Sequence, residues 1–346
     1  MTVHPRRNGA SRPTALQAPL TLLAVALVLA SVVALAAERV WWADLLVHFR
    51  VQYVAGASLL LGPSWWFGRR DWLLAAVLAL LLNAVPVLRA MPAPAPIASA
   101  SAATPAGERV RIASFNLFWR NTDHDAAIAW ARATQADVLV FVEVDARWER
   151  ALDRLRDQYP HAHGERRAGH TGTLVLSRWP LGALQVLDTG TPGTPEVALA
   201  VERPAGPLRL IAVHASWPMG RAASAARARD FAAVADAARE AASPVVAIGD
   251  FNITPWSPHF GALLARAGLR DAASGFGWQP TWPRFLPPLG LQIDHALVSP
   301  DVIVNSFARA NVEGSDHRPI VVDLQLRSRG GSVVGHRAPG AGGDRG

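Results

Sequence analysis

The sequence predicts an α/β (α+β) four-layer sandwich, with two packed mixed β-sheets flanked by helices, preceded by three transmembrane helices. Three observations carry this prediction. The first 90 residues hold long apolar runs, and 51% hydrophobic content is high for a purely soluble chain. A segment rich in Pro, Ala and Ser follows, and about 220 residues in which strand-like and helix-like segments alternate come after it.

The first apolar run, "ALQAPLTLLAVALVLASVVALAA" at residues 15–37, carries no charge over 23 residues. At about 1.5 Å per residue it is long enough to cross a hydrocarbon core of about 30 Å. Two further spans are predicted at residues 51–67 and 72–88, both near the lower limit of roughly 17 residues. Because only "GRRD" joins them, they must form a helical hairpin. The alternative is a set of buried core helices.

The arginines predict the orientation of these spans. Five of them lie on the side of the N-terminus and of the hairpin loop, and three lie on the opposite side, which favours the first side as cytoplasmic. The two groups are Arg6, Arg7, Arg12, Arg69 and Arg70, against Arg39, Arg50 and Arg89. We therefore expect a multi-pass protein of the inner or plasma membrane with the chain after residue 90 on the extracytoplasmic (periplasmic) side. A signal peptide cleaved after residues 34–36 is the alternative for the first run, and it leaves that side unchanged.

The charge balance argues against a polynucleotide surface. The whole chain has a net charge of +7 and a sequence pI of 11.1, and every basic residue is arginine. Residues 107–330, however, contain 24 arginines against 23 acidic residues, so the basic surplus lies outside this region. Nucleic-acid binding usually needs several cations that neutralise phosphates. The absence of cysteine excludes disulfides and thiolate metal sites.

Composition divides the chain into four parts. Residues 1–90 form the membrane anchor, and "MPAPAPIASASAATPAGE", residues 91–108, is a linker that cannot bury enough apolar surface to fold. Residues 109–327 form the folded domain, and the Gly-rich residues 328–346 are expected to be a disordered tail.

Periodicity predicts about eight strands and four helices in the folded domain. The helix at 221–241, rich in Ala and Arg, is expected to be an ordinary amphipathic helix. The expected strands are residues 110–118, 137–144, 172–177, 196–202, 208–215, 244–250, 292–299 and 318–326, and the other expected helices are 125–134, 147–158 and 258–267.

Polar residues recur where these strands begin or end. They are Asn116, Glu143, His214, Asp250, Asn252, Asp294, Asp316 and His317. If these strand ends converge, several carboxylates meet in one cleft, and a buried unpaired carboxylate costs several kcal/mol even after relaxation. A divalent cation and an anionic substrate would remove this cost. Oxygen-rich ligands without thiolates favour Mg²⁺ or Mn²⁺ over zinc.

The motifs "SFNLF", "FVEVD", "VHAS", "GDFN", "IDHALVS" and "GSDHRPIV" occur in this order. The series resembles the endonuclease/exonuclease/phosphatase superfamily, whose members include DNase I-like nucleases, inositol-polyphosphate 5-phosphatases and neutral sphingomyelinases. The resemblance covers residues 109–326 and implies a DNase I-like fold. The combination of "GDFN" with "SDHRP" is its most specific part.

The resemblance implies a metal site made by three residues. Glu143 corresponds to the principal metal ligand, Asn116 lies beside it, and Asp316 joins them. For Asn116 the alternative is an ordinary residue at the end of a strand, and for Glu143 it is a surface glutamate, since "VEVD" also fits ordinary strand alternation.

The resemblance also implies the catalytic roles. Asp250 corresponds to the residue that orients and deprotonates the attacking water, and Asn252 to one that hydrogen-bonds the phosphate. His317 contacts a non-bridging phosphate oxygen, with Asp294 as its carboxylate partner. His214 falls where nuclease members carry a histidine that protonates the leaving oxygen, and a buried structural histidine is the alternative. His295 neighbours Asp294 but is expected on the opposite face of the strand, in a structural role.

These observations predict a membrane-anchored, Mg²⁺-dependent phosphoesterase that hydrolyses a phosphodiester, phosphomonoester or pyrophosphate by in-line attack of water. The near-neutral domain and the anchor favour a lipid-linked or headgroup phosphate over nucleic acid. Two alternatives remain open. One is an extracytoplasmic DNA or RNA nuclease, and the other is a catalytically inactive membrane scaffold.

Overall fold

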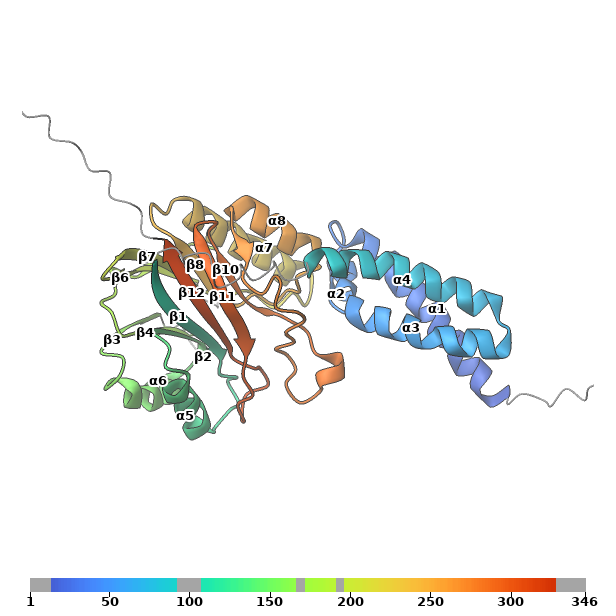
Figure 1. The fold of residues 1–346 in the computed structure, drawn as a ribbon, viewed down its shortest axis with the longest axis horizontal. Helices are drawn as coiled ribbons and strands as arrows, with labels where there is room; N and C mark the ends of the chain where they lie inside the picture. The colour runs from blue at the N-terminus through green and yellow to red at the C-terminus, as the bar shows by residue number, and fades with distance from the viewer. Residues whose placement is uncertain (1–13, 92–106, 166–171, 191–195, 328–346) are drawn as a thin grey trace, which may run out of the picture.

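The computed structural model describes residues 14–91, 107–165, 172–190 and 196–327. Two parts are evident in Figure 1: a β-sandwich with its covering helices, and a bundle of long helices that extends from one end of it. The bundle contains the N-terminal residues, and the sandwich begins at Gly107. The linker expected at 91–108 and the tail expected at 328–346 fall almost wholly outside the described residues.

The first sheet has the strand order β11-β12-β1-β2-β4-β3. Within it β1 and β2 are parallel, and the other neighbouring pairs are antiparallel. Its strands are β1 (Gly107–Asn116), β2 (Val138–Val144), β3 (His161–Glu165), β4 (Gly172–Ser177), β11 (Val302–Arg309) and β12 (Ile320–Arg327).

The second sheet has the order β5-β6-β7-β8-β10-β9. Here β7 and β8 are parallel, so each sheet has one central parallel pair within antiparallel surroundings. Its strands are β5 (Gln185–Val186), β6 (Val197–Arg203), β7 (Gly206–His214), β8 (Val245–Asp250), β9 (Arg270–Asp271) and β10 (Asp294–Val298).

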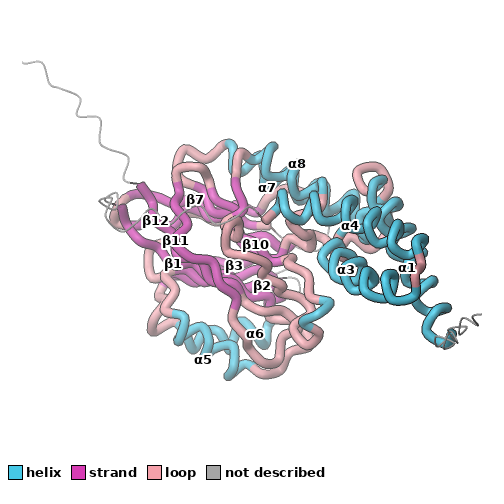
Figure 2. The backbone as a smooth tube through the Cα atoms, turned by 45° about the vertical axis from the view of Figure 1, so that its right-hand side comes forward, coloured by secondary structure: helices cyan, strands magenta, loops and turns pink. Residues whose placement is uncertain are grey.

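The two sheets pack face to face through apolar side chains that alternate along their strands. Ile112 and Val140 of the first sheet share one buried cluster with Leu210 and Val246 of the second. The outer faces are covered by two pairs of helices, which lie on opposite sides of the strands in Figure 2. These are α5 (His124–Thr134) with α6 (Ala146–Leu152), and α7 (Arg221–Arg239) with α8 (Pro258–Ala267). The expected four-layer sandwich is therefore confirmed.

The N-terminal part contains α1 (Gln17–Val33), α2 (Trp41–Val47), α3 (Arg50–Phe67) and α4 (Arg70–Ala90). Small side chains such as Ala57, Ala76 and Ala79 let α3 and α4 approach closely. Among the described residues, two helices are long and apolar enough to cross a membrane, residues 17–36 and 70–90. The expected middle span coincides with α3, which qualifies only together with α2, from which it is bent by 57°. The sequence did not predict α2.

Candidate active site

The eight polar residues at the predicted strand ends meet because both parallel pairs finish at the same edge. His214 ends β7 directly beside Asp250, which ends β8, and Asp294 begins β10 opposite Asp250. In the other sheet, Asn116 ends β1 beside Val142 of β2, one residue before Glu143. Carboxyl ends of parallel strands are where α/β sheets commonly place their ligands.

Glu143 is aimed into the site by a β-bulge. The register between β2 and β4 shifts between Val142 and Val144, and Glu143 has a φ of +60°. A bulge redirects a side chain, and a left-handed backbone at a residue other than Gly is uncommon. Asn252 and Phe118, which also line the pocket described below, share this feature with φ values of +49° and +61°. Sparsely populated conformations of this kind cluster at functional sites.

Gly249 allows β8 to approach β7 at the position just before Asp250. Its φ is +147°, and a Cβ atom there would lie 1.9 Å from the carbonyl oxygen of Val213. Any side chain would therefore push the strand end away from its neighbour. The "GD" of the "GDFN" motif is thus explained by backbone packing as well as by chemistry.

Asp250, Asp294 and His317 form a buried triad. Nδ1 of His317 lies 2.9 Å from Oδ2 of Asp294, and its Nε2 lies 3.7 Å from Oδ2 of Asp250. Burial and then the charge of Asp294 raise the pKa of Asp250 to about 7. Although burial disfavours a charged imidazole, Asp294 and Asp250 raise the pKa of His317 to about 10. At neutral pH His317 is therefore a cation, and Asp250 can take up a proton or release one.

Asn116 connects this triad to Glu143. Its Nδ2 donates to Oε1 of Glu143 at 3.0 Å and to Oδ2 of Asp250 at 3.1 Å. The other carboxylate oxygen of Glu143 accepts the backbone N–H of Trp119 at 2.8 Å. Nε2 of His214 lies 3.8 Å from Glu143 Oε1. Two carboxylates from different sheets are thus held by one amide.

Asn252 and Asp316 complete the group. The backbone N–H of Asn252 donates to Asp250 Oδ1 at 2.9 Å, and its side-chain amide donates to the carbonyl of Ala215. Asp316 accepts a hydrogen bond from Nε1 of Trp282 on Oδ2 at 2.9 Å. Its Oδ1 is buried and has no hydrogen-bond partner among the described residues.

The donor set suits a hard divalent cation. Asp250, Asp294 and His317 each offer a ligand atom within 4.8 Å of the others, and Glu143 and Asp316 add two more carboxylates close by. The unpartnered Oδ1 of Asp316 is the kind of buried oxygen that a cation would satisfy. The three residues of the triad were predicted from the sequence to be catalytic. The predicted metal ligands are Glu143, Asn116 and Asp316.

Six of the eight predicted site residues line a pocket of about 670 Å³. Its polar end holds Glu143, His214, Asp250, Asn252, Asp316 and His317. The rest is largely apolar, with Trp119, Trp217, Trp282, Leu291 and Ile293 among its walls. Arg120, whose guanidinium lies 4.4 Å from the ring centre of Trp119, is the one arginine among the described residues that line it. The pocket thus combines a cluster of carboxylates and histidines with apolar walls.

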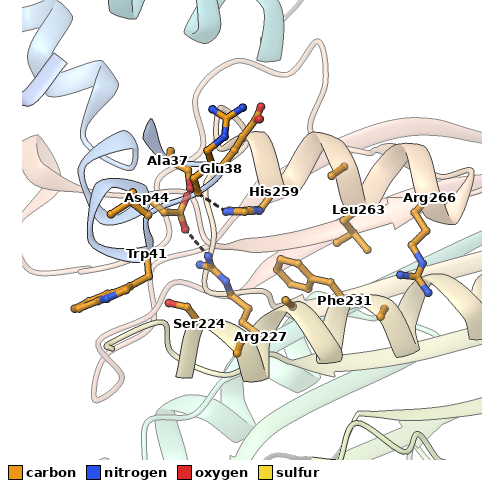
Figure 3. Close-up of a pocket in the computed structure, with 16 residues that line it drawn as sticks. Ala37, Glu38, Trp41, Asp44, Ser224, Arg227, Phe231, His259, Leu263 and Arg266 are labelled. Carbon is orange, nitrogen blue, oxygen red and sulfur yellow. Dashed lines mark hydrogen bonds and ion pairs between the residues drawn. The ribbon is translucent and has the colours of Figure 1, made fainter. Parts of the chain in front are cut away.

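The sequence did not predict the contact of the N-terminal part with this domain. Figure 3 shows Asp44 of α2 facing Arg227 of α7, and the two form a buried ion pair. Arg227 Nη1 also donates to the carbonyl of Asn252 at 2.9 Å, and Ser257 donates to Asp44 Oδ1 at 2.9 Å. The helix expected to be ordinary thus carries a buried arginine. The spacing indicated that Arg227 shares a helical face with Phe231, four positions later, but not which segment covers that face.

All eight predicted site residues lie together, while their assigned roles remain predictions. His295 is fully buried, and its Nε2 lies 2.8 Å from the carbonyl of Ile253, as expected for a structural histidine.

Comparison with known proteins agrees with this architecture. The sequence profile described as "Endonuclease/Exonuclease/phosphatase family" matches residues 113–317. No curated protein matches the chain in sequence. Among solved structures, an endonuclease/exonuclease/phosphatase from Bacteroides vulgatus is 20% identical with a TM-score of 0.54, covering 63% of this chain and 99% of that one. A 3′ phosphatase from Neisseria bound to a product DNA hairpin is also 20% identical, with a TM-score of 0.53 and coverages of 62% and 98%.

Proposed function

Because the chain belongs to the endonuclease/exonuclease/phosphatase family, we propose that it is a membrane-anchored, divalent-metal-dependent phosphoesterase acting on a lipid-linked or lipid-headgroup phosphate. The observation that carries the proposal is the pocket, in which a cluster of carboxylates and histidines closes one end of a cavity with apolar walls. The scissile phosphate would bind at the polar end, and the apolar part of the substrate would lie against the tryptophans.

The cation would be held by Glu143 and Asp316, with Asn116 positioning Glu143 through its amide. Bound Mg²⁺ or Mn²⁺ would neutralise the charge that develops on the phosphoryl oxygens. The excess of carboxylates over cationic side chains in the pocket supports a divalent ion over a metal-free site.

The residues of the chain divide the remaining work of hydrolysis. Asp250 accepts a proton from the attacking water, whose oxygen forms a bond to phosphorus as the bond to the leaving oxygen breaks. His214 returns a proton to that leaving oxygen. The imidazolium of His317, held by Asp294, donates to a non-bridging phosphate oxygen, and the cationic form is the one its raised pKa favours.

Asn252 donates to a second non-bridging oxygen, which an aspartate in its place could not do. One hydrogen of its side-chain amide is donated to the carbonyl of Ala215 at 2.9 Å. Because an amide carries two hydrogens, the second can be donated to the phosphate. The backbone of Asn252 meanwhile holds Asp250 Oδ1. The adjacent carboxylate and amide of the "GDFN" motif therefore have separate tasks.

Exposed apolar side chains, in the two loops that contribute Trp217 and Trp282 to the pocket and on the helical bundle, support a membrane-bound substrate. Trp217 and Met219, which follow β7, are 65% and 58% exposed, and Phe285 in the loop before β10 is 71% exposed. On the helical bundle, Leu22 and Leu74 are each 70% exposed, which favours lipid over water as their surroundings. The arginine distribution favours the extracytoplasmic side for the active domain.

The test is a substrate panel with the full-length protein in detergent micelles. It compares a long-chain polyprenyl pyrophosphate, phosphatidylglycerol, the soluble ester bis(p-nitrophenyl) phosphate and plasmid DNA, each with Mg²⁺ and with excess chelator. We expect faster hydrolysis of a lipid substrate than of DNA, and loss of activity with the chelator or with Asp250→Asn or His317→Ala. Faster cleavage of DNA would reject the lipid preference in favour of a nuclease. Inactivity on every substrate would favour the alternative of a catalytically inactive membrane scaffold.

A further inference from the structure

The pocket that holds the catalytic side chains is incomplete without the N-terminal part of the chain. Leu45 of α2 and His48, which caps the C-terminal end of α2, line it together with Asp250 and His317. The sandwich therefore supplies the polar end of the pocket, and a segment directly connected to the candidate spans supplies one of its walls.

His48, one of the residues of this wall, carries a buried polar atom without a hydrogen-bond partner among the described residues. Its side chain is buried, with only 6% of the residue exposed, and its Nδ1 lies 2.9 Å from Oγ1 of Thr254. Its Nε2 is also buried and has no hydrogen-bond partner among the described residues. Leaving a buried nitrogen unpaired costs about 1–3 kcal/mol. Because Nδ1 is already engaged, Nε2 is the atom available to a ligand.

The position of His48 is fixed by the catalytic domain. Its backbone carbonyl accepts a hydrogen bond from Nε1 of Trp256 at 3.2 Å, and Thr254 and Trp256 follow Asn252 closely in the chain. The pair between Asp44 and Arg227, drawn in Figure 3, holds the preceding turn of α2. His48 is thus held by hydrogen bonds from both its ring and its backbone, which is the positioning that a binding residue requires.

We propose that α2 is part of the substrate-binding site and that Nε2 of His48 forms a hydrogen bond to the substrate next to the scissile phosphate, on the side of its apolar chain. Leu45 contacts the beginning of that chain, as do Trp282 and Leu291, which line the same pocket. The ligand is a phosphate ester or anhydride whose polar head continues into a membrane-embedded chain. This inference rests on the proposed function and makes recognition of the lipid depend on the anchor.

The test compares His48→Leu and His48→Gln with the unmodified full-length protein on polyprenyl pyrophosphate in micelles and on soluble bis(p-nitrophenyl) phosphate. Loss of one buried hydrogen bond predicts that His48→Leu lowers kcat/KM on the lipid substrate about 10- to 100-fold. The soluble ester has no membrane-embedded chain, so on it we expect His48→Leu to change kcat/KM by less than about threefold. His48→Gln keeps a polar group and should recover most of the lost activity.

The matched control is Gln52→Leu. Nε2 of Gln52 in α3 donates to the carbonyl of Gly290 at 3.1 Å, but Gln52 does not line the pocket. Its replacement therefore weakens the contact between the N-terminal part and the sandwich without changing a side chain of the pocket. Equal losses on both substrates in His48→Leu, or no loss on either, would overturn the role of His48 while the phosphoesterase function stands. A wild-type protein inactive on both substrates would overturn the function itself and this inference with it.

Discussion

The ion pair between Asp44 and Arg227 yields the sharpest prediction about how the two parts of the chain are joined. The side chains are 2% and 4% exposed, so neither charge is solvated by water. Arg227→Met leaves Asp44 with the hydroxyl of Ser257 as its remaining side-chain hydrogen-bond donor among the described residues. The same change removes the donor to the carbonyl of Asn252.

The magnitude follows from the cost of an uncompensated buried charge. Breaking a buried ion pair by removing one partner costs about 3–5 kcal/mol, whereas replacing both partners by apolar residues is often near neutral. We therefore expect Arg227→Met and Asp44→Leu each to destabilise the docked position of α2 by about 3–5 kcal/mol. The double variant should cost less than either single variant, because no charge is left unpaired.

The assay is native-state hydrogen exchange of the amides of α2 in the detergent-solubilised protein. At 1.36 kcal/mol per factor of ten, the predicted cost corresponds to exchange roughly 10²- to 10⁴-fold faster in the single variants. Arg221→Met is the control, because Arg221 lies exposed in the first turn of the same helix. If each single variant changes exchange by less than about fivefold and the double variant shows their sum, the two charges are not coupled and the reasoning fails.

Three further predictions concern the active site, the helical bundle and the orientation in the membrane. Activity should rise with pH through about 7, where Asp250 loses its proton, and fall through about 10, where His317 loses its own. Asp294→Asn removes the charge that raises both pKa values, so both limbs of the pH–rate profile should move to lower pH. Unmoved limbs would contradict the assignment. Asn83→Leu should lower the thermal unfolding temperature, because Asn83 forms hydrogen bonds with Ser31 of α1 at 2.7 Å and with Arg50 of α3 at 3.2 Å. We expect the free energy of unfolding to fall by about 1–2 kcal/mol, and not to change in the control Leu88→Ala, whose side chain faces outward. Equal unfolding temperatures of the two variants would show that the network is unimportant. Since the chain has no cysteine, a membrane-impermeant maleimide applied to intact cells should label a Glu240→Cys variant and spare Asp71→Cys, which lies in the first turn of α4. The reverse labelling pattern would invert the topology.

The strands that the sequence predicted best are those buried on both faces. "DVLVFVEV" and "PVVAIGD" are near-continuous apolar runs, and they became β2 and β8, each a member of the central parallel pair of its sheet. The strand β11, Val302–Arg309, was missed because a register shift between Val304 and Ser306 breaks its alternation. The strand β3, "HAHGE", was missed because it lies at a sheet edge and carries almost no apolar signal.

The active-site residues could be predicted because they sit next to strand ends, where a local motif and the sheet topology together fix their position. His48 and Arg227 could not, since each acquires its role through a contact with a segment about two hundred positions away. Nothing in the seven residues of α2 predicts that they pack on a distant domain, and a single Asp in an apolar helix is compatible with many partners. Periodicity identifies the face of a helix and leaves open what covers it.

The ion pair and the pocket wall are linked through the geometry of one short helix. His48 follows Asp44 by four positions, so the two lie on the same face of α2, and Leu45 is adjacent. Sliding α2 by one residue would turn this face by about 100° and move His48 away from Thr254. Such a shift would also leave both Asp44 and Arg227 buried without a partner, which is far costlier than any change in apolar contact. The charges therefore set the register of α2, and through that register they determine which side chains form the wall of the pocket.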